Sequence, residues 1–397
     1  MRKHIDLEEW STCCGCSACA QACPKGCITM QADGEGFLYP VIDENTCIAC
    51  GACEHVCPIK NTSPEPTGEP DAYAAYSKNT EQRLESSSGG VFSLLAEEIL
   101  QNSGVVFGAA MSEDCRKAQH IAVERQEDLW KLRGSKYLQS EIGSTYRQAE
   151  NALKQGRRVL FSGTPCEIEG LHRYLRREYE NLLCVDLICH GVPSAKLWEK
   201  YVSYRENCAG AAAQRTFFRH KKYGWKTFAV LFEFANNTAY EQVLSKDLFM
   251  QMFLQNLCLR PSCYACAFKK KNRVSDITLA DFWGCDSVCP ELDDDKGLSL
   301  VLCHSIMGRT VFKAIEGKIV MEPVSLEKAL YGNPSLVKSC KKPEQRDAFM
   351  MQMDSLMIPQ LAQGYLKKPS LCSYIKQLIP ICLLYTSPSP RDYAASR

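Results

Sequence analysis

Cysteines dominate the chemistry that this sequence can support, because 24 of them occur among 397 residues. Eight form two copies of the pattern C-x2-C-x2-C-x3-C-P, and the second copy lies 34 residues after the first, as from Cys13 to Cys47. The short spacings place three thiolates around one iron–sulfur cubane, and the cysteine before proline ligates the other cluster. The pattern therefore predicts two 4Fe–4S clusters with crossed ligands, one held by Cys13, Cys16, Cys19 and Cys57 and the other by Cys47, Cys50, Cys53 and Cys23.

A pair of zinc knuckles is the alternative interpretation, since zinc also binds four cysteines at short spacings. Zinc leaves the prolines after Cys23 and Cys57 unexplained, whereas the doubled pattern resembles bacterial two-cluster ferredoxins. A segment of about 60 residues buries little apolar surface, so bound metal would stabilise it. Cys14 and Cys27 fall outside the pattern, and we expect them to be small buried hydrophobic residues.

Four further cysteines lie in segments that have the character of loops. Cys166 and Cys189 each follow an apolar strand signal, and Cys263 and Cys266 form a C-x2-C pair. The carboxyl ends of parallel strands meet at one crevice, so these thiols could converge there. Their spacing alone leaves three alternatives open, namely a third 4Fe–4S cluster, a zinc site, or unrelated thiols.

The order of secondary-structure signals predicts an α+β protein, with a small two-cluster ferredoxin-like domain followed by a larger α/β domain with a mixed sheet. We expect the first domain at 1–60, an extended linker at the proline-rich stretch 61–70, and the second domain at 71–381. A hairpin is predicted around Ala235-Asn-Asn237. The other signals indicate helices at 91–101, 142–155, 168–179, 195–204 and 247–257, and strands at 105–110, 158–161, 182–188, 277–282 and 298–304.

The charge balance gives no indication of a nucleic-acid or membrane-surface partner, since the net charge is +1. We also expect no integral membrane segment, because no apolar stretch is long enough. The first eleven residues contain three acidic side chains and no apolar core of a signal peptide. We therefore expect a cytoplasmic protein whose cysteines stay reduced and serve metal or redox chemistry.

The last residues, 382–397, resemble the translation of a sequencing adaptor, which would place the natural end of the chain outside this sequence. A disordered tail rich in serine and proline is the alternative.

Six short motifs stand in an order that resembles the coenzyme F420 hydrogenase/dehydrogenase beta-subunit family, in the form with an N-terminal dicluster ferredoxin module. The resemblance covers roughly 71–330 together with the ferredoxin segment. The motifs lie at 87–90, 134–137, 161–166, 186–193, 260–266 and 275–284.

This resemblance implies an FAD with a third 4Fe–4S cluster beside it. The family pattern implies Cys166, Cys189, Cys263 and Cys266 as the cluster ligands. Cys285 and Cys289 follow the last motif, and either could replace one of the four.

The residues expected to hold the flavin are those able to bind its pyrophosphate. Glycines before a helix allow close approach, and the helix dipole favours an anion; a plain helix cap is the alternative. A basic loop at 219–226 could hold a polyanionic tail, although we expect Lys221, Lys222 and Lys269 to lie in solvent. The candidate cofactor-binding residues are Ser87, Ser88, Gly89, Gly90, Ser135 and Lys136.

Asp281 and His190 are the candidate catalytic residues, because Asp281 lies at a strand end and His190 follows a strand, each next to a predicted cofactor site. A turn cap for Asp281 and a local hydrogen bond for His190 are the alternatives.

The sequence as a whole predicts an iron–sulfur flavoprotein oxidoreductase. It would transfer electrons between a two-electron donor or acceptor, such as a coenzyme F420-like deazaflavin, and the ferredoxin clusters through FAD. Its partner would be a redox protein or a small redox substrate. The alternative function is a flavin-free electron-transfer subunit that feeds a partner redox enzyme.

Overall fold

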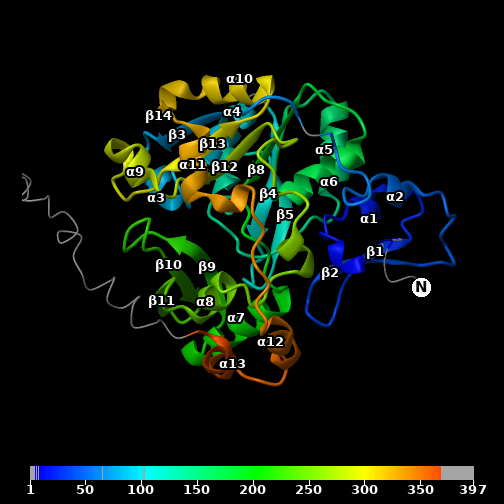
Figure 1. Cartoon of the computed structure of the whole chain (residues 1–397), viewed down its shortest axis with the longest axis vertical. Coiled ribbons are helices and arrows are strands. Elements are labelled where there is room, and N and C mark those ends of the chain that lie inside the picture. Colours follow the sequence, from blue (N-terminus) through cyan, green and yellow to red (C-terminus); the bar gives the residue numbers. More distant parts are fainter. Residues whose placement is uncertain (1–4, 6, 8, 65, 102, 368–397) are drawn as a thin grey trace, which may run out of the picture.

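The computed structural model describes residues 5, 7, 9–64, 66–101 and 103–367. The tail at 382–397 that resembles an adaptor lies outside the described residues. Figure 1 shows an N-terminal segment in blue at one side, a large sheet flanked by helices, and a smaller sheet with its own helices below. Within the described ranges, no helix has the length and apolar character needed to cross a membrane.

A nine-stranded mixed sheet forms the centre, in the order β14-β3-β13-β12-β8-β7-β4-β5-β6. Its middle strands β12, β8, β7 and β4 run parallel, while β13, β3 and β14 on one side and β5 on the other pair antiparallel. This arrangement confirms the predicted α/β domain with a mixed sheet. The strands are β3 (Asp71–Ser77), β4 (Val105–Met111), β5 (Ala118–Val123), β6 (Ser140–Glu141), β7 (Val159–Ser162), β8 (Leu182–Leu187), β12 (Ile277–Asp281), β13 (Ser299–Cys303) and β14 (Ile319–Pro323).

Alternating side chains bury both faces of this sheet, as the two-residue period of a strand requires. Val106 and Leu160 point to the face covered by α4 and α10, and Phe107 and Phe161 point to the face covered by α5 and α6. The helices around the sheet are α3 (Thr80–Glu85), α4 (Val91–Gln101), α5 (Thr145–Lys154), α6 (Pro165–Leu175), α9 (Cys285–Val288), α10 (Ile306–Ala314) and α11 (Leu326–Gly332).

Helix α6 begins three residues before the predicted start at 168. Thr164 and Glu167 form a capping box, and Pro165 occupies the first turn. A proline there lacks only an N–H that the helix would leave unpaired. This start places Cys166 on the first turn of the helix.

A second core surrounds a three-stranded antiparallel sheet of β9 (Ala213–His220), β10 (Ala229–Phe234) and β11 (Ala239–Val243). The turn between β10 and β11 confirms the predicted hairpin. Buried aromatic side chains such as Trp198 and Phe249 fill the space between the sheet and its helices. These helices are α7 (Ala195–Ala209), α8 (Leu248–Leu254), α12 (Arg346–Gln352) and α13 (Ile358–Tyr365).

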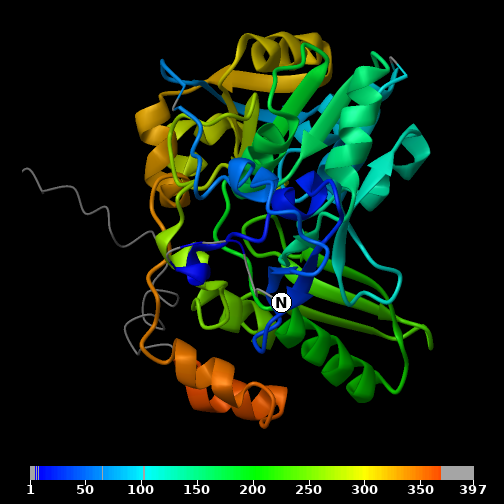
Figure 2. The same ribbon diagram turned by 90° about the vertical axis from the view of Figure 1, so that its right-hand side faces the viewer.

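The N-terminal segment consists of α1 (Ala18–Ala22), β1 (Ile28–Ala32), β2 (Leu38–Ile42) and α2 (Ala52–His55). It does not stand apart from the rest, because α1 packs against α5 and α6 and the β1–β2 turn reaches α12 (Figure 2). The stretch that follows at 61–64 and 66–70 contains no helix or strand.

Six short 3₁₀-helices complete the described elements. They are η1 (Trp10–Thr12), η2 (Gln126–Lys131), η3 (Pro261–Ala265), η4 (Pro290–Leu292), η5 (Glu316–Lys318) and η6 (Pro334–Leu336).

Candidate redox site

The first predicted ligand set, Cys13, Cys16, Cys19 and Cys57, comes together at α1. Cys19 and Cys57 pack in one buried cluster with the half-buried Cys13, although Cys57 lies more than 30 residues along the chain. Burial, and then the charges of Cys13 and Cys57, raise the pKa of the Cys19 thiol. Crowding and burial make such thiols hard to ionise. A bound iron ion would stabilise them in the ionised, thiolate form. Cys23 and Cys53 of the second set pack against the same cluster, so the crossed assignment of ligands stays a prediction.

The second predicted set, Cys23, Cys47, Cys50 and Cys53, lies at the surface. Cys47 and Cys50 are exposed, whereas Cys23 and Cys53 are partly buried. Cys27 is buried as expected, but its sulfur lies 3.3 Å from that of Cys23. The N-terminal segment thus has one buried and one exposed thiol set.

The four cysteines of the larger domain line a single cavity of about 180 Å³. Cys166 enters from the first turn of α6 and Cys189 from the loop after β8. Cys263 lies in η3, and Cys266 directly follows it. Burial raises the pKa of Cys263 to about 12, and the nearby thiols Cys166 and Cys266 add to the effect. Strand ends therefore converge as the topology requires.

The four thiols surround the cavity without meeting at a single point. In the part of the chain that the structure describes, no three His, Cys, Asp or Glu side chains lie close enough to hold one metal ion. The cavity of about 180 Å³ between the four thiols would accommodate a group larger than one ion, and the third 4Fe–4S cluster stays a prediction.

Cys14 lines the same cavity, which the sequence did not indicate. Its buried thiol interacts with Cys16 of the first set and with Cys166 of the third. The expectation of a simple buried residue is therefore incomplete. The adjacent pair Cys13–Cys14 was the available signal, since two neighbouring cysteines in an extended segment face different directions.

Cys285 and Cys289 do not line this cavity. Both are buried at α9 with Trp225 and Phe282, in a different core cluster. The placement therefore leaves the four-cysteine set as the candidate for the third cluster.

Two lysines expected in solvent are instead held by backbone carbonyls. Lys269 lines the thiol cavity and donates to the carbonyls of Cys189 and Ser335. Lys221 is only 9% exposed and donates to three carbonyls, including that of Ser88 at 2.7 Å. These two expectations are wrong, because a run of basic residues does not reveal a ring of carbonyl acceptors formed by distant segments.

The third lysine, Lys222, lies in solvent as expected. Its side chain is exposed and pairs with Glu241.

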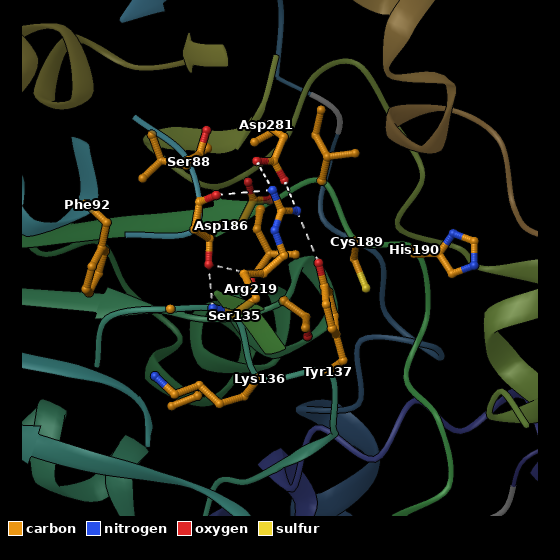
Figure 3. Close-up of a pocket in the computed structure, with 18 of the residues that line it drawn as sticks. Ser88, Phe92, Ser135, Lys136, Tyr137, Asp186, Cys189, His190, Arg219 and Asp281 are labelled. Atoms are coloured by element: carbon orange, nitrogen blue, oxygen red, sulfur yellow. Dashed lines mark hydrogen bonds and ion pairs between the residues drawn. The ribbon is translucent and has the colours of Figure 1, made fainter. Parts of the chain in front are cut away.

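A larger cavity of about 670 Å³ opens at the carboxyl ends of β7, β8 and β12, next to the thiol cavity. Thr164 and the loop 189–192 line both cavities. The volume lies within the range of about 300–1,000 Å³ that is typical of cofactor and ligand sites. Figure 3 shows this pocket with Cys189 at its edge.

Five of the six predicted cofactor-binding residues line this larger cavity, namely Ser87, Ser88, Gly90, Ser135 and Lys136. The Ser87 hydroxyl accepts a hydrogen bond from the backbone N–H of Ser135 at 2.6 Å, which joins the two predicted anion-binding segments (Figure 3). Gly90, with φ +86°, leads into α4.

Gly89 does not line the cavity. Its N–H donates to the Ser299 hydroxyl, and a Cβ at this position would lie 2.4 Å from the carbonyl oxygen of Ala75. The glycine is therefore required for close packing on β3 and β13, and the prediction that it binds a cofactor is not supported by its placement.

Asp281 lies at the cavity with both carboxylate oxygens engaged. Arg219 donates to them at 2.7 and 2.8 Å (Figure 3), and Trp225 Nε1 donates to one of them at 2.7 Å. The Arg219 side chain is 3% exposed and also bonds the Tyr137 hydroxyl. Asp281 therefore fixes a buried cation at the cavity wall, and nothing in the sequence identified Arg219 as its partner.

His190 lies on the wall between the two cavities. Its Nε2 is 2.7 Å from the Asn256 side-chain oxygen, and its ring meets Phe253 edge-on. Burial lowers the pKa of His190, so the imidazole is neutral near pH 7. In Figure 3 the ring points away from Arg219 and Asp281, so the two predicted catalytic residues do not act on one another.

Comparison with known families accounts for this arrangement. Residues 72–146 match the N-terminal model and residues 156–328 the C-terminal model of the coenzyme F420 hydrogenase/dehydrogenase beta subunit. The chain belongs to this family. Residues 12–61 match a 4Fe–4S dicluster domain, so the family domain here carries an iron–sulfur module at its N-terminus.

A curated relative and a solved structure extend the comparison. The chain is 24% identical over 171 residues to coenzyme F420-dependent sulfite reductase from Methanocaldococcus jannaschii, and the match spans 43% of this chain and 26% of that protein. A chain of the F420-reducing [NiFe] hydrogenase complex from Methanosarcina barkeri is 14% identical with a TM-score of 0.46, over 76% of this chain and 92% of that one.

Cys263→Ala should remove about one third of the bound iron and leave the dicluster pair intact, because it deletes one thiol of the third set only. Iron and sulfide per chain, measured anaerobically, check this. Cys285→Ala is the control, since Cys285 is a buried cysteine outside the cavity, and its iron content should equal that of the parent. Unchanged iron in Cys263→Ala would exclude Cys263 as a required ligand.

Asp281→Asn should lower the free energy of unfolding by about 3 kcal/mol, since it leaves Arg219 buried without a counter-charge. Denaturant unfolding of the loaded protein measures the change. Glu233→Gln breaks the solvent-exposed pair with Arg215 and should cost less than about 1 kcal/mol. Equal losses of unfolding free energy in the two variants would contradict the structural role given to the Arg219–Asp281 pair.

Proposed function

We propose that this protein is an iron–sulfur flavoprotein oxidoreductase. It passes electrons between a two-electron carrier, such as a coenzyme F420-like deazaflavin or another reduced cofactor, and ferredoxin-type 4Fe–4S clusters by way of FAD. The observation that carries the proposal is the shared wall between the large cavity and the cavity of four thiols, formed by Thr164 and 189–192. A cofactor in one cavity would lie beside a cluster in the other.

The residues of the large cavity suit a flavin with a pyrophosphate. The first turn of α4 faces the cavity, and a helix N-terminus attracts anions through its free N–H groups. Lys136 and Arg219 add two cations, while Tyr137, Phe253 and Trp283 add aromatic surface. A bound flavin would supply the exchange between two-electron and one-electron chemistry that iron–sulfur clusters lack.

The thiol sets provide a continuous sequence of sites across the protein. The exposed Cys47 and Cys50 lie at the outer end, the buried set with Cys16 follows, and Cys14 interacts with both Cys16 and Cys166 of the third set. We propose that the exposed set receives a redox partner protein, and that the large cavity receives the small redox substrate.

This division assigns electron relay to residues 1–60 and cofactor chemistry to the domain from 71 onward, with 61–70 joining them. Asp281 acts as a positioning residue for Arg219, and His190, neutral and packed between the cavities, separates the cofactor from the thiols. A cytoplasmic location, where thiols stay reduced, accords with the number of cysteines.

A cofactor inventory tests the proposal against the flavin-free alternative. Protein purified anaerobically should contain about twelve irons and one FAD per chain, as expected for three cubanes and one flavin site. Iron, acid-labile sulfide and extracted flavin are the measurements. About eight irons without flavin, in protein that retains its dicluster spectrum, would instead support an electron-transfer subunit.

Flavin affinity should depend on pH through Lys136, whose pKa is lowered to about 7 by burial. A bound pyrophosphate favours the charged form and so raises this pKa. Binding then takes up a proton above pH 7, and the affinity should fall as the pH rises from 7. Lys136→Met should weaken FAD binding about tenfold, ~1.4 kcal/mol, at about pH 6.5 and should remove much of this pH dependence.

Titration of deflavinated protein by flavin fluorescence measures the affinity at each pH. Lys222→Met is the control, because Lys222 is exposed and pairs with Glu241 outside the cavity. If the FAD affinity of Lys136→Met changes with pH in parallel with that of the parent, Lys136 does not contact the bound pyrophosphate.

A further inference from the structure

Arg260 is a buried cation at the junction between two predicted cluster sites. Its side chain is among the largest that are fully buried, and its guanidinium group donates in three directions. Nε bonds the carbonyl of Cys13 at 2.8 Å, Nη1 the side-chain oxygen of Gln139 at 2.9 Å, and Nη2 the carbonyl of Leu38 at 3.0 Å. One side chain therefore joins the ferredoxin segment to the larger domain.

The acceptors of Arg260 are all uncharged. Arginine remains protonated in proteins, and a buried charge is unfavourable unless an opposite charge compensates it. Of the five other buried arginines of the described chain, Arg205 reaches Asp247 through the hydroxyls of Tyr201 and Tyr240, and four have direct carboxylate partners. These pairs are Arg83 with Asp294, Arg219 with Asp281, Arg273 with Asp186 and Arg346 with Glu35. The compensating charge for Arg260 must have another origin.

The surroundings of Arg260 identify that origin. Cys13, whose carbonyl it binds, belongs to the first thiol set. Cys263 of the third set lies in η3, which begins just after Arg260, and its N–H donates to the Arg260 carbonyl at 2.9 Å. The packing is close, because a Cβ on Gly15 would lie 2.8 Å from Arg260 Nη1. Gln139 completes the junction by donating to the Cys14 carbonyl at 2.9 Å.

We propose that Arg260 is a positioning residue whose charge is balanced by the cysteinate-bound clusters of the first and third thiol sets, and that it raises the reduction potential of both. The inference rests on the proposed function, because it needs clusters at those sites. A cation near a cluster stabilises the reduced, more negative state. The exposed set with Cys47 does not contact Arg260, so its potential should be independent of this residue.

The test is a redox titration of the three clusters, followed by electron paramagnetic resonance, in the full-length loaded protein. Arg260→Gln should lower the midpoint potentials of the first and third clusters, by about 59 mV if the reduction equilibrium changes tenfold. Arg260→Lys, which keeps the charge but not the planar fork, should stay near the parent values. The surface cluster provides an internal reference in each variant.

Arg346→Gln is the matched control. Arg346 is equally buried and also ties the ferredoxin segment to the larger domain, but its charge is already balanced by Glu35. Its loss should leave all three potentials unchanged. Parent potentials in Arg260→Gln at full iron content would overturn the proposal, as would equal shifts in Arg260→Gln and Arg260→Lys.

If Arg260→Gln loses iron, the iron content of Arg260→Lys decides between the two roles of the side chain. Normal loading of Arg260→Lys would then show that the charge is required, whereas loss of iron in both variants would show that the hydrogen-bonding fork is required and would overturn the electrostatic role. The proposed function fails separately, through a parent protein that holds fewer than three clusters.

Discussion

The convergence of parallel strand ends is the constraint on which the rest of this structure depends. Strands β7, β8 and β12 run in the same direction and end at one edge of the large sheet. The ends of these strands and the segments after them therefore place Asp281, Cys166 and Cys189 around adjoining cavities. Right-handed parallel topology makes this edge the natural ligand site of an α/β fold. The two cavities share a wall because the same strand ends build both.

The ferredoxin segment is held against this edge by buried polar contacts and not by its linker. Arg260 binds carbonyls of the segment at the inner end, and Arg346 pairs with Glu35 at the hairpin. Between them, Gln21 accepts from the backbone of Tyr146 in α5. Breaking such contacts leaves uncompensated polar groups, so the orientation is well defined. Fixed separation between thiol sets follows from this docking, and rapid electron transfer would require it.

The charged groups of the large cavity differ in how firmly they are held. Arg219 is fixed by two hydrogen bonds to Asp281, whose other contact is the indole N–H of Trp225. Lys136 has only carbonyl acceptors, and burial lowers its pKa to about 7. One cation is thus permanent, and the charge of the other would respond to a bound anion. This combination would suit the anionic cofactor proposed for this pocket.

The sequence by itself determined the features that depend on short stretches of chain. The cysteine spacing indicated both thiol sets of the N-terminal segment, and strand signals ending at Cys166 and Cys189 indicated a third. Only the tertiary structure brought Cys14 to Cys166, buried Lys221 among carbonyls, packed Gly89 on β3 and separated Cys285 from the thiol cavity. Spacing of a few residues is fixed by local backbone geometry, whereas contacts between residues a hundred or more positions apart depend on how complete elements pack.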